Sequence, residues 1–356
     1  MTADDLARLT LELCRVPSET GNERQIADRV ETRCRVAAGA TATRRVGDSV
    51  ICDPAPTATG PTIALVGHLD TVRCAAEQEY AIREGRVYGC GASDMKGGVA
   101  VMLALLERWR QVGGKRPVWI FYDGEEGAYV ENGLEEVFAS GVLPPIDYAF
   151  ILEPTDGGVQ VGCQGTLHAT VTVRGRRAHS ARPWQGENAL SRAAPLLERL
   201  AAFGRREHRI GELVFYEVLN ATQAATENSP NVIPDLVRLN VNHRFPPGMT
   251  VETALATVRE AVGEEAEVEL RDASPPGDVC HDHPLVAGWL RNEGLAVEAK
   301  QAWTDVARFT GRGIPAINFG PGETAQAHQA NEWCPVASLA ATYGALERYL
   351  SASRPA

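Results

Sequence analysis

The chain has 356 residues, of which 44% are hydrophobic and 23% are charged, and its formal net charge is -11 at pH 7. This length favours two domains, each with enough sequence to bury a core of its own. The negative charge argues against nucleic acid or an anionic membrane as the main partner, because both reward clustered Lys and Arg. We therefore expect a small-molecule partner, with no nucleic acid and no membrane among its ligands.

The N-terminal segment and the cysteines indicate a cytoplasmic protein. The stretch TADDLARLTLELCRV after Met1 has two early acids and a helical apolar pattern, which does not fit a signal peptide. No window approaches 18 uninterrupted apolar residues, so no membrane span is predicted. The eight cysteines are scattered singly without a CxxC pair. We expect them to be reduced and mostly buried, and their spacing does not indicate a thiolate zinc site.

Apolar periodicity predicts alternating helices and strands in the first part of the chain. Residues 3–15 and 22–37 have helical spacing. TIALVGHLDTV, PVWIFYDG and DYAFILEPT are interpreted as buried strands, and GGVAVMLALLERWRQV as a helix closed by Gly113 and Gly114. Such alternation predicts an α/β domain, with a mostly parallel sheet, helices on both faces, and ligands outside the carboxyl ends of the strands.

From about residue 166 the pattern changes to half-exposed strands and amphipathic helices. Their predicted order is βαββαβ, the split βαβ unit of a ferredoxin-like α+β domain. The later segments PLVAGWLRNEG and IPAINFGPG return to helix and buried strand. We therefore expect residues 166–278 to be an inserted domain, and residues 1–165 with 279–356 to form the main domain.

Five places in the sequence share one pattern, an apolar run followed closely by His, Asp or Glu. The residues are His68 and Asp70 in VGHLD, Asp94 in GCGASDMKGG, Glu125 and Glu126 in FYDGEEG, Glu153 in FILEPT, and His328 in GPGETAQAHQANE. Taken singly, each has an ordinary structural interpretation, such as a helix cap, a turn acid or a hydrogen-bonded histidine. Together they would converge at one edge of a parallel sheet. Carboxylates crowded there require a cation.

The residue types favour a pair of divalent ions. Two His and three carboxylates, without a thiolate, suit zinc or a similar ion. A single catalytic zinc takes three protein ligands and leaves one position open, so five ligands are too many for one ion. Two ions that share one bridging Asp would use all five, with a private His and a private Glu for each.

Several motifs also resemble those of the co-catalytic zinc aminoacylase and carboxypeptidase family. They are GHLDTV, YGCGASDMKGG, the EE pair, LEPT, GRRAHS and AHQANE, and the similarity runs from about residue 10 to the C-terminus. Within the family, GCQGT, ARPWQGENA, NVIPD, WTDVARF and GIPAINFGPG look most like succinyl-diaminopimelate desuccinylases of the actinobacterial kind. The resemblance implies a zinc aminopeptidase-like catalytic domain and an inserted lid domain that also forms a homodimer.

The resemblance also implies the metal ligands. His68 and Glu153 would bind one zinc, Glu126 and His328 would bind the other, and Asp94 would bridge them. The cofactor would be two Zn²⁺ per subunit, for which Co²⁺ or Mn²⁺ could substitute.

Three further residues have implied catalytic roles. Asp70 would accept the other ring N–H of His68 and fix its tautomer, with a turn acid as the alternative. Glu125 would be the general base and acid, because the proton of a metal-bound water needs an acceptor that can deliver it to the leaving nitrogen. His179 would donate to the oxyanion of the tetrahedral intermediate in the partner subunit's active site, or be a solvated loop histidine.

The expected substrate is a small anionic N-acyl amino acid. By resemblance, the candidate binding residues are Asn231, Arg244, Thr304 and Arg308, and each could instead be structural.

Two positions depart from the family's pattern, and one pair of histidines is a tempting alternative. Gln164 stands where many desuccinylases carry an arginine, which leaves the acyl group open. Gly124 occupies the place of the usual acid before the glutamate pair, and Asp123 stands one residue earlier. His281 and His283 are interpreted as a helix-entry loop and not as ligands.

The expected reaction is removal of the succinyl group from N-succinyl-LL-2,6-diaminopimelate, a step of lysine and diaminopimelate biosynthesis. The alternatives are acetylornithine deacetylase, another N-acyl amino acid hydrolase, and a dipeptidase or carboxypeptidase of the same family. A non-enzymatic metal-binding or amino-acid-binding descendant is disfavoured, because Glu125 and all five ligands are retained.

Overall fold

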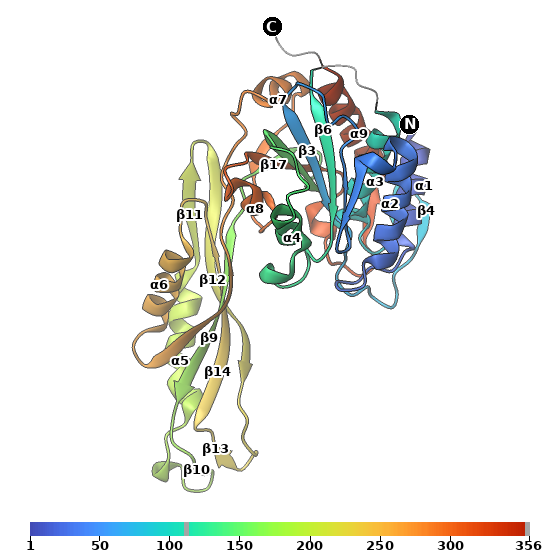
Figure 1. Ribbon diagram of the computed structural model, residues 1–356. Helices are drawn as coiled ribbons and strands as arrows, with labels where there is room; N and C mark the ends of the chain where they lie inside the picture. Colours follow the sequence, from blue (N-terminus) through green and yellow to red (C-terminus); the bar gives the residue numbers. More distant parts are fainter. Residues whose placement is uncertain (110–113, 353–356) are drawn as a thin grey trace. The chain divides into compact units, whose positions relative to one another are not determined.

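The computed structural model describes residues 1–109 and 114–352 and divides the chain into two compact units (Figure 1). The first comprises Met1–Gly162, Val279–Glu298 and Arg308–Ala356, and the second comprises Cys163–Asp278 and Ala299–Ala307. Compared with the predicted boundaries, residues 163–165 and 299–307 fall in the second unit. Backbone hydrogen bonds explain this, because Gln164 N donates to Ala302 O (3.2 Å) and Cys163 pairs with Gly277 in both directions.

The first unit is built on a sheet whose described strands run in the order β1-β2-β6-β3-β7-β17-β8-β16. Strands β6, β3, β7 and β17 run parallel to one another, whereas β1, β2 and β6 pair antiparallel at one edge and β8 pairs antiparallel with β17. Their bounds are Thr43–Val46 (β1), Ser49–Cys52 (β2), Thr62–His68 (β3), Arg116–Tyr122 (β6), Tyr148–Pro154 (β7), Val159–Val161 (β8), Val297–Ala299 (β16) and Ala316–Gly320 (β17). The central strands are buried along almost their whole length, as expected for a sheet covered on both faces.

Helices cover this sheet. Helix α3 packs against α1, α2 and α9, and Figure 1 shows α1 to α3 on one side of β3 and β6, with α4 on the other. The bounds are Ala3–Cys14 (α1), Arg24–Ala38 (α2), Gly97–Arg108 (α3), Gly133–Ala139 (α4), Ala287–Glu293 (α7), Val306–Thr310 (α8) and Val336–Ser351 (α9). Helix α3 ends before the predicted stop, and Gly113 lies outside the described residues. The predicted α/β class is confirmed.

The second unit is an antiparallel sheet in the order β11-β12-β14-β9-β15, with helices α5 and α6. The bounds are Gly165–Arg174 (β9), Ala189–Phe203 (α5), Arg205–Ile210 (β11), Leu213–Ala225 (β12), Leu236–Phe245 (β14), Val251–Val262 (α6) and Ala266–Ser274 (β15). Without β11 this is the predicted βαββαβ order. The prediction missed β11 because its sequence, RREHRI, is charged and it lies at the sheet edge, where it buries little.

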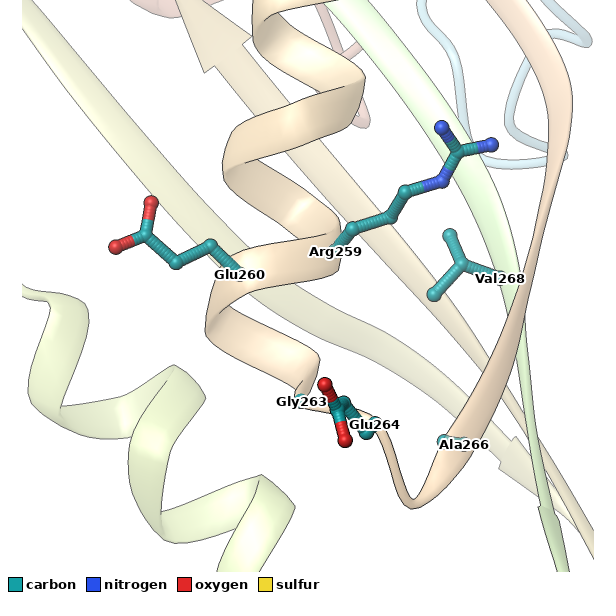
Figure 2. A pocket seen from close by; sticks show the side chains of 6 residues that line it. All are labelled: Arg259, Glu260, Gly263, Glu264, Ala266 and Val268. Carbon is teal, nitrogen blue, oxygen red and sulfur yellow. The ribbon is translucent and has the colours of Figure 1, made fainter.

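The core of the second unit follows directly from sequence periodicity. Strand β9 buries every second residue, from Leu167 to Val173, against the helices. Helix α5 contributes Ala189, Ala193, Leu196 and Leu200 at helical spacing. A surface cavity of about 400 Å³ lies between the end of α6 and β15; in Figure 2 Arg259 points towards β15 and Glu260 points to the other side of the helix.

The prediction for the cysteines was wrong at one pair. Cys74 and Cys90 form a disulfide with 5.7 Å between their Cα atoms, whereas the other six cysteines are free. The two cysteines are 16 positions apart in the sequence, and neither position carries a local sequence signal for pairing. The bond connects the segment after Asp70 to the segment that leads into Asp94. In the described part of the chain, no helix has the length and hydropathy needed to cross a bilayer.

Candidate metal centre

The parallel sheet brings the predicted ligands to one edge. His68 is the last residue of β3 and pairs with Tyr122, the last residue of β6, so Glu125 and Glu126 follow at the same level. Glu153 lies near the end of β7, which runs parallel to β3 on the other side. Asp94 lies in the turn before α3, and His328 lies in the loop after β17.

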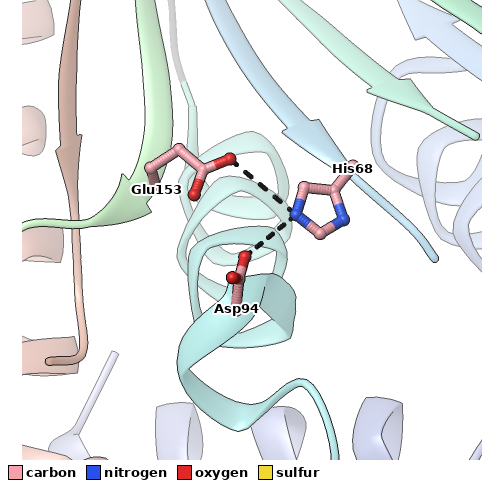
Figure 3. A group of neighbouring side chains, drawn as sticks. All are labelled: His68, Asp94 and Glu153. Atoms are coloured by element: carbon pink, nitrogen blue, oxygen red, sulfur yellow. Dashed lines mark hydrogen bonds and ion pairs between the residues drawn. The ribbon is translucent and has the colours of Figure 1, made fainter. Parts of the chain in front are cut away.

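One group of potential ligand atoms is formed by His68, Asp94 and Glu153 (Figure 3). The Nε2 atom of His68 lies 3.1 Å from Asp94 Oδ1 and 3.8 Å from Glu153 Oε1. Figure 3 shows both carboxylates directed at the same ring nitrogen. The His68 ring is fully buried and Glu153 is 5% exposed, so these charges are shielded from solvent.

A second group is formed by Asp94, Glu126 and His328. The Nε2 atom of His328 lies 3.0 Å from Glu126 Oε1 and 3.7 Å from Asp94 Oδ2. The two oxygens of Asp94 therefore face different imidazoles. A carboxylate in this position can serve two ions at once.

The donor set fits a pair of divalent cations. Ligand atoms about 2 Å from a tetrahedral zinc lie roughly 3.3 Å from one another, and the distances within the two groups scatter around that value. Burial lowers the pKa of His68, but hydrogen bonds with Asp70 and Asp94 outweigh it and leave the pKa well above its ordinary value. The hydrogen bond with Glu126 raises the pKa of His328 to about 9. Carboxylates that draw protons onto both imidazoles carry an excess of negative charge, which bound cations would neutralise.

Asp70 forms hydrogen bonds with His68 and with the turn that carries Glu125 and Glu126. The Nδ1 atom of His68 lies 3.1 Å from the main-chain oxygen of Asp70 and 3.4 Å from its Oδ1. The Asp70 carboxylate also accepts the backbone N–H of Glu125 and that of Glu126, each at 3.0 Å, and the hydroxyl of Thr20. Burial raises the pKa of Asp70. The interaction with His68 and the two backbone N–H groups lower this pKa by a larger amount, so the net shift is downward.

The turn that carries the two glutamates depends on Gly124. Its φ is +71°, and a Cβ there would lie 2.8 Å from the main-chain oxygen of Glu131. Asp123 turns away from the cluster and bonds Ser49, at 2.5 Å between Oδ1 and Oγ. Glu125 forms a further potential ligand group with His68 and Glu126, so one of its carboxylate oxygens lies within 4.8 Å of a ring nitrogen of His68.

Two of the predicted residues lie together in the second unit. His179 is in strand β10 (Ala178–His179), which pairs with β13 (Val232–Ile233) next to Asn231. Its side chain is exposed, and its Nδ1 accepts the backbone N–H of Ala181 at 3.0 Å. A neutral His179 in this arrangement carries its proton on Nε2, where it is a donor.

Arg244 and Thr304 are also in the second unit. Within residues 1–109 and 114–352, Arg244 forms no ion pair with an acidic side chain, and its Nε donates to Asn242 Oδ1 at 3.2 Å. Burial lowers the pKa of Arg244. Thr304 is 2% exposed, and its hydroxyl has no hydrogen-bond partner among the same described residues.

The side chains of Arg308 and Gln164 each form hydrogen bonds with residues of their own unit. Arg308 is 1% exposed, lies 2.5 Å from Glu135, stacks on the ring of Tyr129 and donates to the main-chain oxygen of Tyr129. Gln164 donates to the main-chain oxygen of Tyr216 and to Gln301. The amide of Gln164 therefore links backbone segments of the second unit.

His281 and His283 lie in the turns that precede α7, as predicted. The ring of His283 packs against Tyr148 with 5.2 Å between centroids. Neither residue belongs to a potential ligand group in the described part of the chain.

Sequence reasoning overlooked Glu332. Its carboxylate is 3% exposed and accepts three backbone N–H groups, from Gly91, Ser93 and Asp94. Burial raises its pKa to about 7 although these bonds lower it. The signal available in the sequence was an acid four residues after His328 and directly before a short apolar strand.

Comparison with known proteins places the chain in a family. Residues 64–352 match the family described as Peptidase family M20/M25/M40. The chain belongs to this family. Membership makes it a metal-dependent hydrolase of the metallopeptidase type and confirms the family predicted from the motifs.

Several curated members of the M20 family are similar over nearly the whole chain. A protein of Mycobacterium tuberculosis strain H37Rv, named provisionally as a succinyl-diaminopimelate desuccinylase, is 37% identical over 97% of this chain and 98% of its own. The succinyl-diaminopimelate desuccinylase of Corynebacterium glutamicum is 35% identical over 96% and 95%. The acetylornithine deacetylase of Myxococcus xanthus is 30% identical over 80% and 78%.

Solved structures share the fold. A tripeptidase from Staphylococcus aureus has a TM-score of 0.81 at 20% identity and covers 99% of this chain and 98% of its own. A Bacillus subtilis protein described as a dinuclear metal binding peptidase from the M20 family has a TM-score of 0.69 at 16% identity, over 98% and 97%. At these identities the similarity concerns the fold alone.

Proposed function

We propose that this M20 family member removes the succinyl group from N-succinyl-LL-2,6-diaminopimelate. The observation that carries the proposal is the pair of ligand groups that share Asp94, with Glu125 within reach of the same imidazole. The specific reaction is supported by relatives with 35% and 37% identity over nearly the whole chain that are named for it. We further propose a cytoplasmic location, since the substrate is a biosynthetic intermediate.

The proposed cofactor is two Zn²⁺ per subunit. His68 and Glu153 would hold one ion, Glu126 and His328 the other, and Asp94 both. When bound, the zinc ions would acidify a water molecule and polarise the amide carbonyl of the substrate. The structural relative from Bacillus subtilis, described as dinuclear, supports a pair of ions.

Glu125 is the proposed proton carrier. Its carboxylate takes a proton from the attacking water, whose oxygen bonds to the succinyl carbonyl carbon. When the C–N bond breaks, Glu125 returns the proton to the departing nitrogen, which leaves succinate and the free amine. Asp70 supports this task because it holds the backbone N–H of Glu125 and orients His68.

His179 is the proposed donor to the oxyanion, and the proposed homodimer would bring it into the partner subunit's site. Its Nδ1 already accepts a hydrogen bond, so Nε2–H is available for the oxyanion. The second unit, which we propose as lid and dimerisation domain, exposes Trp184, Leu190, Leu197 and Leu270. We propose that these side chains would be covered in the dimer, since contiguous apolar surface marks association sites.

Arg244 and Thr304 are the best supported of the proposed substrate contacts. A partly buried guanidinium with no acidic partner in residues 1–109 and 114–352 is unfavourable until an anion arrives. The unsatisfied hydroxyl of Thr304 could bond a substrate oxygen. Asn231 and Arg308 remain further candidates.

Acetylornithine deacetylation is the second candidate, and one observation favours it. Gln164 stands where a cation is found in many desuccinylases, and its amide is engaged with Tyr216 and Gln301. The second carboxylate of a succinyl group would lack that cation, whereas an acetyl group would not require it.

The deciding experiment is a substrate panel with the zinc-loaded protein. The panel contains N-succinyl-LL-2,6-diaminopimelate, N-acetylornithine and two dipeptides, with chelator-treated protein as control. We expect the succinyl substrate to have the highest kcat/KM by at least tenfold, and activity to vanish on chelation and return with zinc. A higher kcat/KM for N-acetylornithine would replace the proposed reaction by deacetylation.

A further inference from the structure

Glu332 lies beside the candidate metal centre without belonging to either ligand group. Its Oε1 accepts the backbone N–H of Ser93 at 2.7 Å and that of Asp94 at 2.9 Å, and its Oε2 accepts the N–H of Gly91 at 2.8 Å. Three of the roughly four acceptor positions of the carboxylate are thus used on one short segment of backbone. This segment carries the aspartate whose two oxygens face the two imidazoles.

The backbone between Gly91 and Asp94 cannot satisfy these N–H groups by itself. Gly91 is left-handed, with φ of +76°, and Asp94 is non-helical, with φ of -117° and ψ of 93°. A Cβ at Gly91 would lie 2.6 Å from Thr71 Cγ2, so this path is also closely packed. Buried N–H groups without an acceptor are costly, and Glu332 supplies acceptors for three of them.

Glu332 also connects this segment to the one that carries His328. It follows His328 by four residues, and its main-chain oxygen accepts the N–H of Gly89 at 3.0 Å. The next residues form β18 (Trp333–Pro335), which pairs with β5 (Arg86–Tyr88). One side chain therefore fixes the spacing between two segments that each provide a potential ligand.

A carboxylate suits these contacts better than a carboxamide. Donors approach both oxygens, whereas glutamine would present an NH₂ group to one of them. Glu332 is 3% exposed, so its charge is shielded from solvent. Three backbone N–H dipoles thus accommodate the Glu332 charge close to an acidic cluster.

We infer that Glu332 is a positioning residue that holds the Asp94 carboxylate between the two metal ions without binding either ion. The inference rests on the proposed role of Asp94 as the shared ligand. Loss of the Glu332 contacts would let the Asp94 backbone move and weaken both sites together. A substitution of a ligand that binds only one of the two ions would instead weaken mainly that one site.

The test is zinc affinity, measured by competition with a chromophoric chelator on the full-length protein. We expect Glu332→Gln to weaken binding of both zinc ions by about 10- to 100-fold. Glu332→Asp, which keeps the charge but shortens the side chain, should weaken both by a smaller factor. In the Co²⁺-loaded protein, the visible absorption bands should shift in Glu332→Gln, because they report ligand geometry.

Glu217→Gln is the matched control. Glu217 is 2% exposed, lies in the second unit and bonds His208 and His243. Loss of the Glu217 carboxylate should lower the thermal stability of the protein. The zinc affinity should stay within twofold of the wild-type value. If Glu332→Gln and Glu332→Asp both have the zinc affinities and Co²⁺ spectra of the wild type, the inference is overturned. The proposed function would still stand in that case. A wild-type protein that binds no zinc would overturn the proposed function, and this inference with it.

Discussion

Asp70 Oδ1 accepts the backbone N–H of Glu125 at 3.0 Å, across 55 residues of sequence. The same carboxylate accepts the N–H of Glu126 and lies 3.4 Å from the ring nitrogen of His68. One fully buried acid thus fixes the turn of the proposed base and the ring of a proposed ligand. This arrangement extends the role expected for Asp70 from its position two residues after His68.

The first prediction concerns Asp70→Asn. Asparagine has one acceptor oxygen, so one of the two turn amides would face an NH₂ group. We expect kcat/KM to fall by about 10- to 100-fold and the free energy of unfolding to fall by about 1–3 kcal/mol. Steady-state kinetics and urea unfolding would measure both.

Asp123→Asn provides the control for Asp70. Asp123 belongs to the same turn but bonds Ser49, and it is in no ligand group of the described residues. Equal losses of kcat/KM in the two variants would show that the turn tolerates neither change and would remove the special role of Asp70.

The second prediction separates ligand from base. Glu125→Gln should retain two zinc ions per subunit, since the proposed ligands are intact, and lose kcat by at least about 10²- to 10⁴-fold because no carboxylate moves the proton. Metal content by atomic emission and kcat on the preferred substrate are the measurements. A variant that loses one zinc would make Glu125 a ligand.

The third prediction concerns Arg244→Gln. Because burial lowers the pKa of Arg244 and no acidic side chain among the described residues pairs with it, removal of its charge should leave the thermal midpoint unchanged or raise it. The KM for the succinyl substrate should rise by about 10-fold or more, since charged hydrogen bonds contribute about 1.5–3 kcal/mol. An unchanged KM would remove Arg244 from the proposed binding residues.

Arg308→Gln is the contrasting variant. Arg308 is buried, and its guanidinium contacts Glu135 and Tyr129. We expect the free energy of unfolding to fall by about 2–4 kcal/mol, towards the lower end because Glu135 is 39% exposed and keeps Arg312 as a partner. A KM that rises without loss of stability would instead indicate direct contact with substrate.

The fourth prediction is a pH dependence. Burial raises the pKa of Glu135, but hydrogen bonds and charges of Arg308 and Arg312 outweigh it, so the pKa lies below the ordinary value of 4.5. A depressed carboxylate pKa stabilises the fold fully above about pH 4.5, and that stability is lost as the pH falls through the folded-state pKa. In the metal-free protein, Glu135→Gln should therefore lose less stability between pH 6 and pH 3.5 than the wild type. Parallel losses would contradict the assignment.

The sequence alone determined the architecture and a set of residues that the fold brings close together as potential metal ligands. Buried strands that end in His, Asp or Glu can be recognised locally, because both the apolar run and the polar residue lie within one short window. Parallel strands bring the ends of β3, β6 and β7 together, which is why His68, Glu126 and Glu153 could be expected to meet. Asp94, in the turn before α3, and His328, in the loop after β17, were named from the same local pattern and join them through loops. The charged edge strand β11 was missed for the converse reason, since its sequence lacks an apolar run.

Only the tertiary structure decided how these residues are held. The bonds from Gly91 to Glu332 and from Glu125 to Asp70 span 241 and 55 residues, and the Cys74–Cys90 disulfide joins two loops. A glutamine such as Gln164 carries no local signal for its partner. Its hydrogen bond to the main-chain oxygen of Tyr216 depends on the position of β12 in the folded chain. Hydrogen bonds depend on distance and direction between atoms brought together by folding, and periodicity in the sequence specifies the face of an element but not those directions.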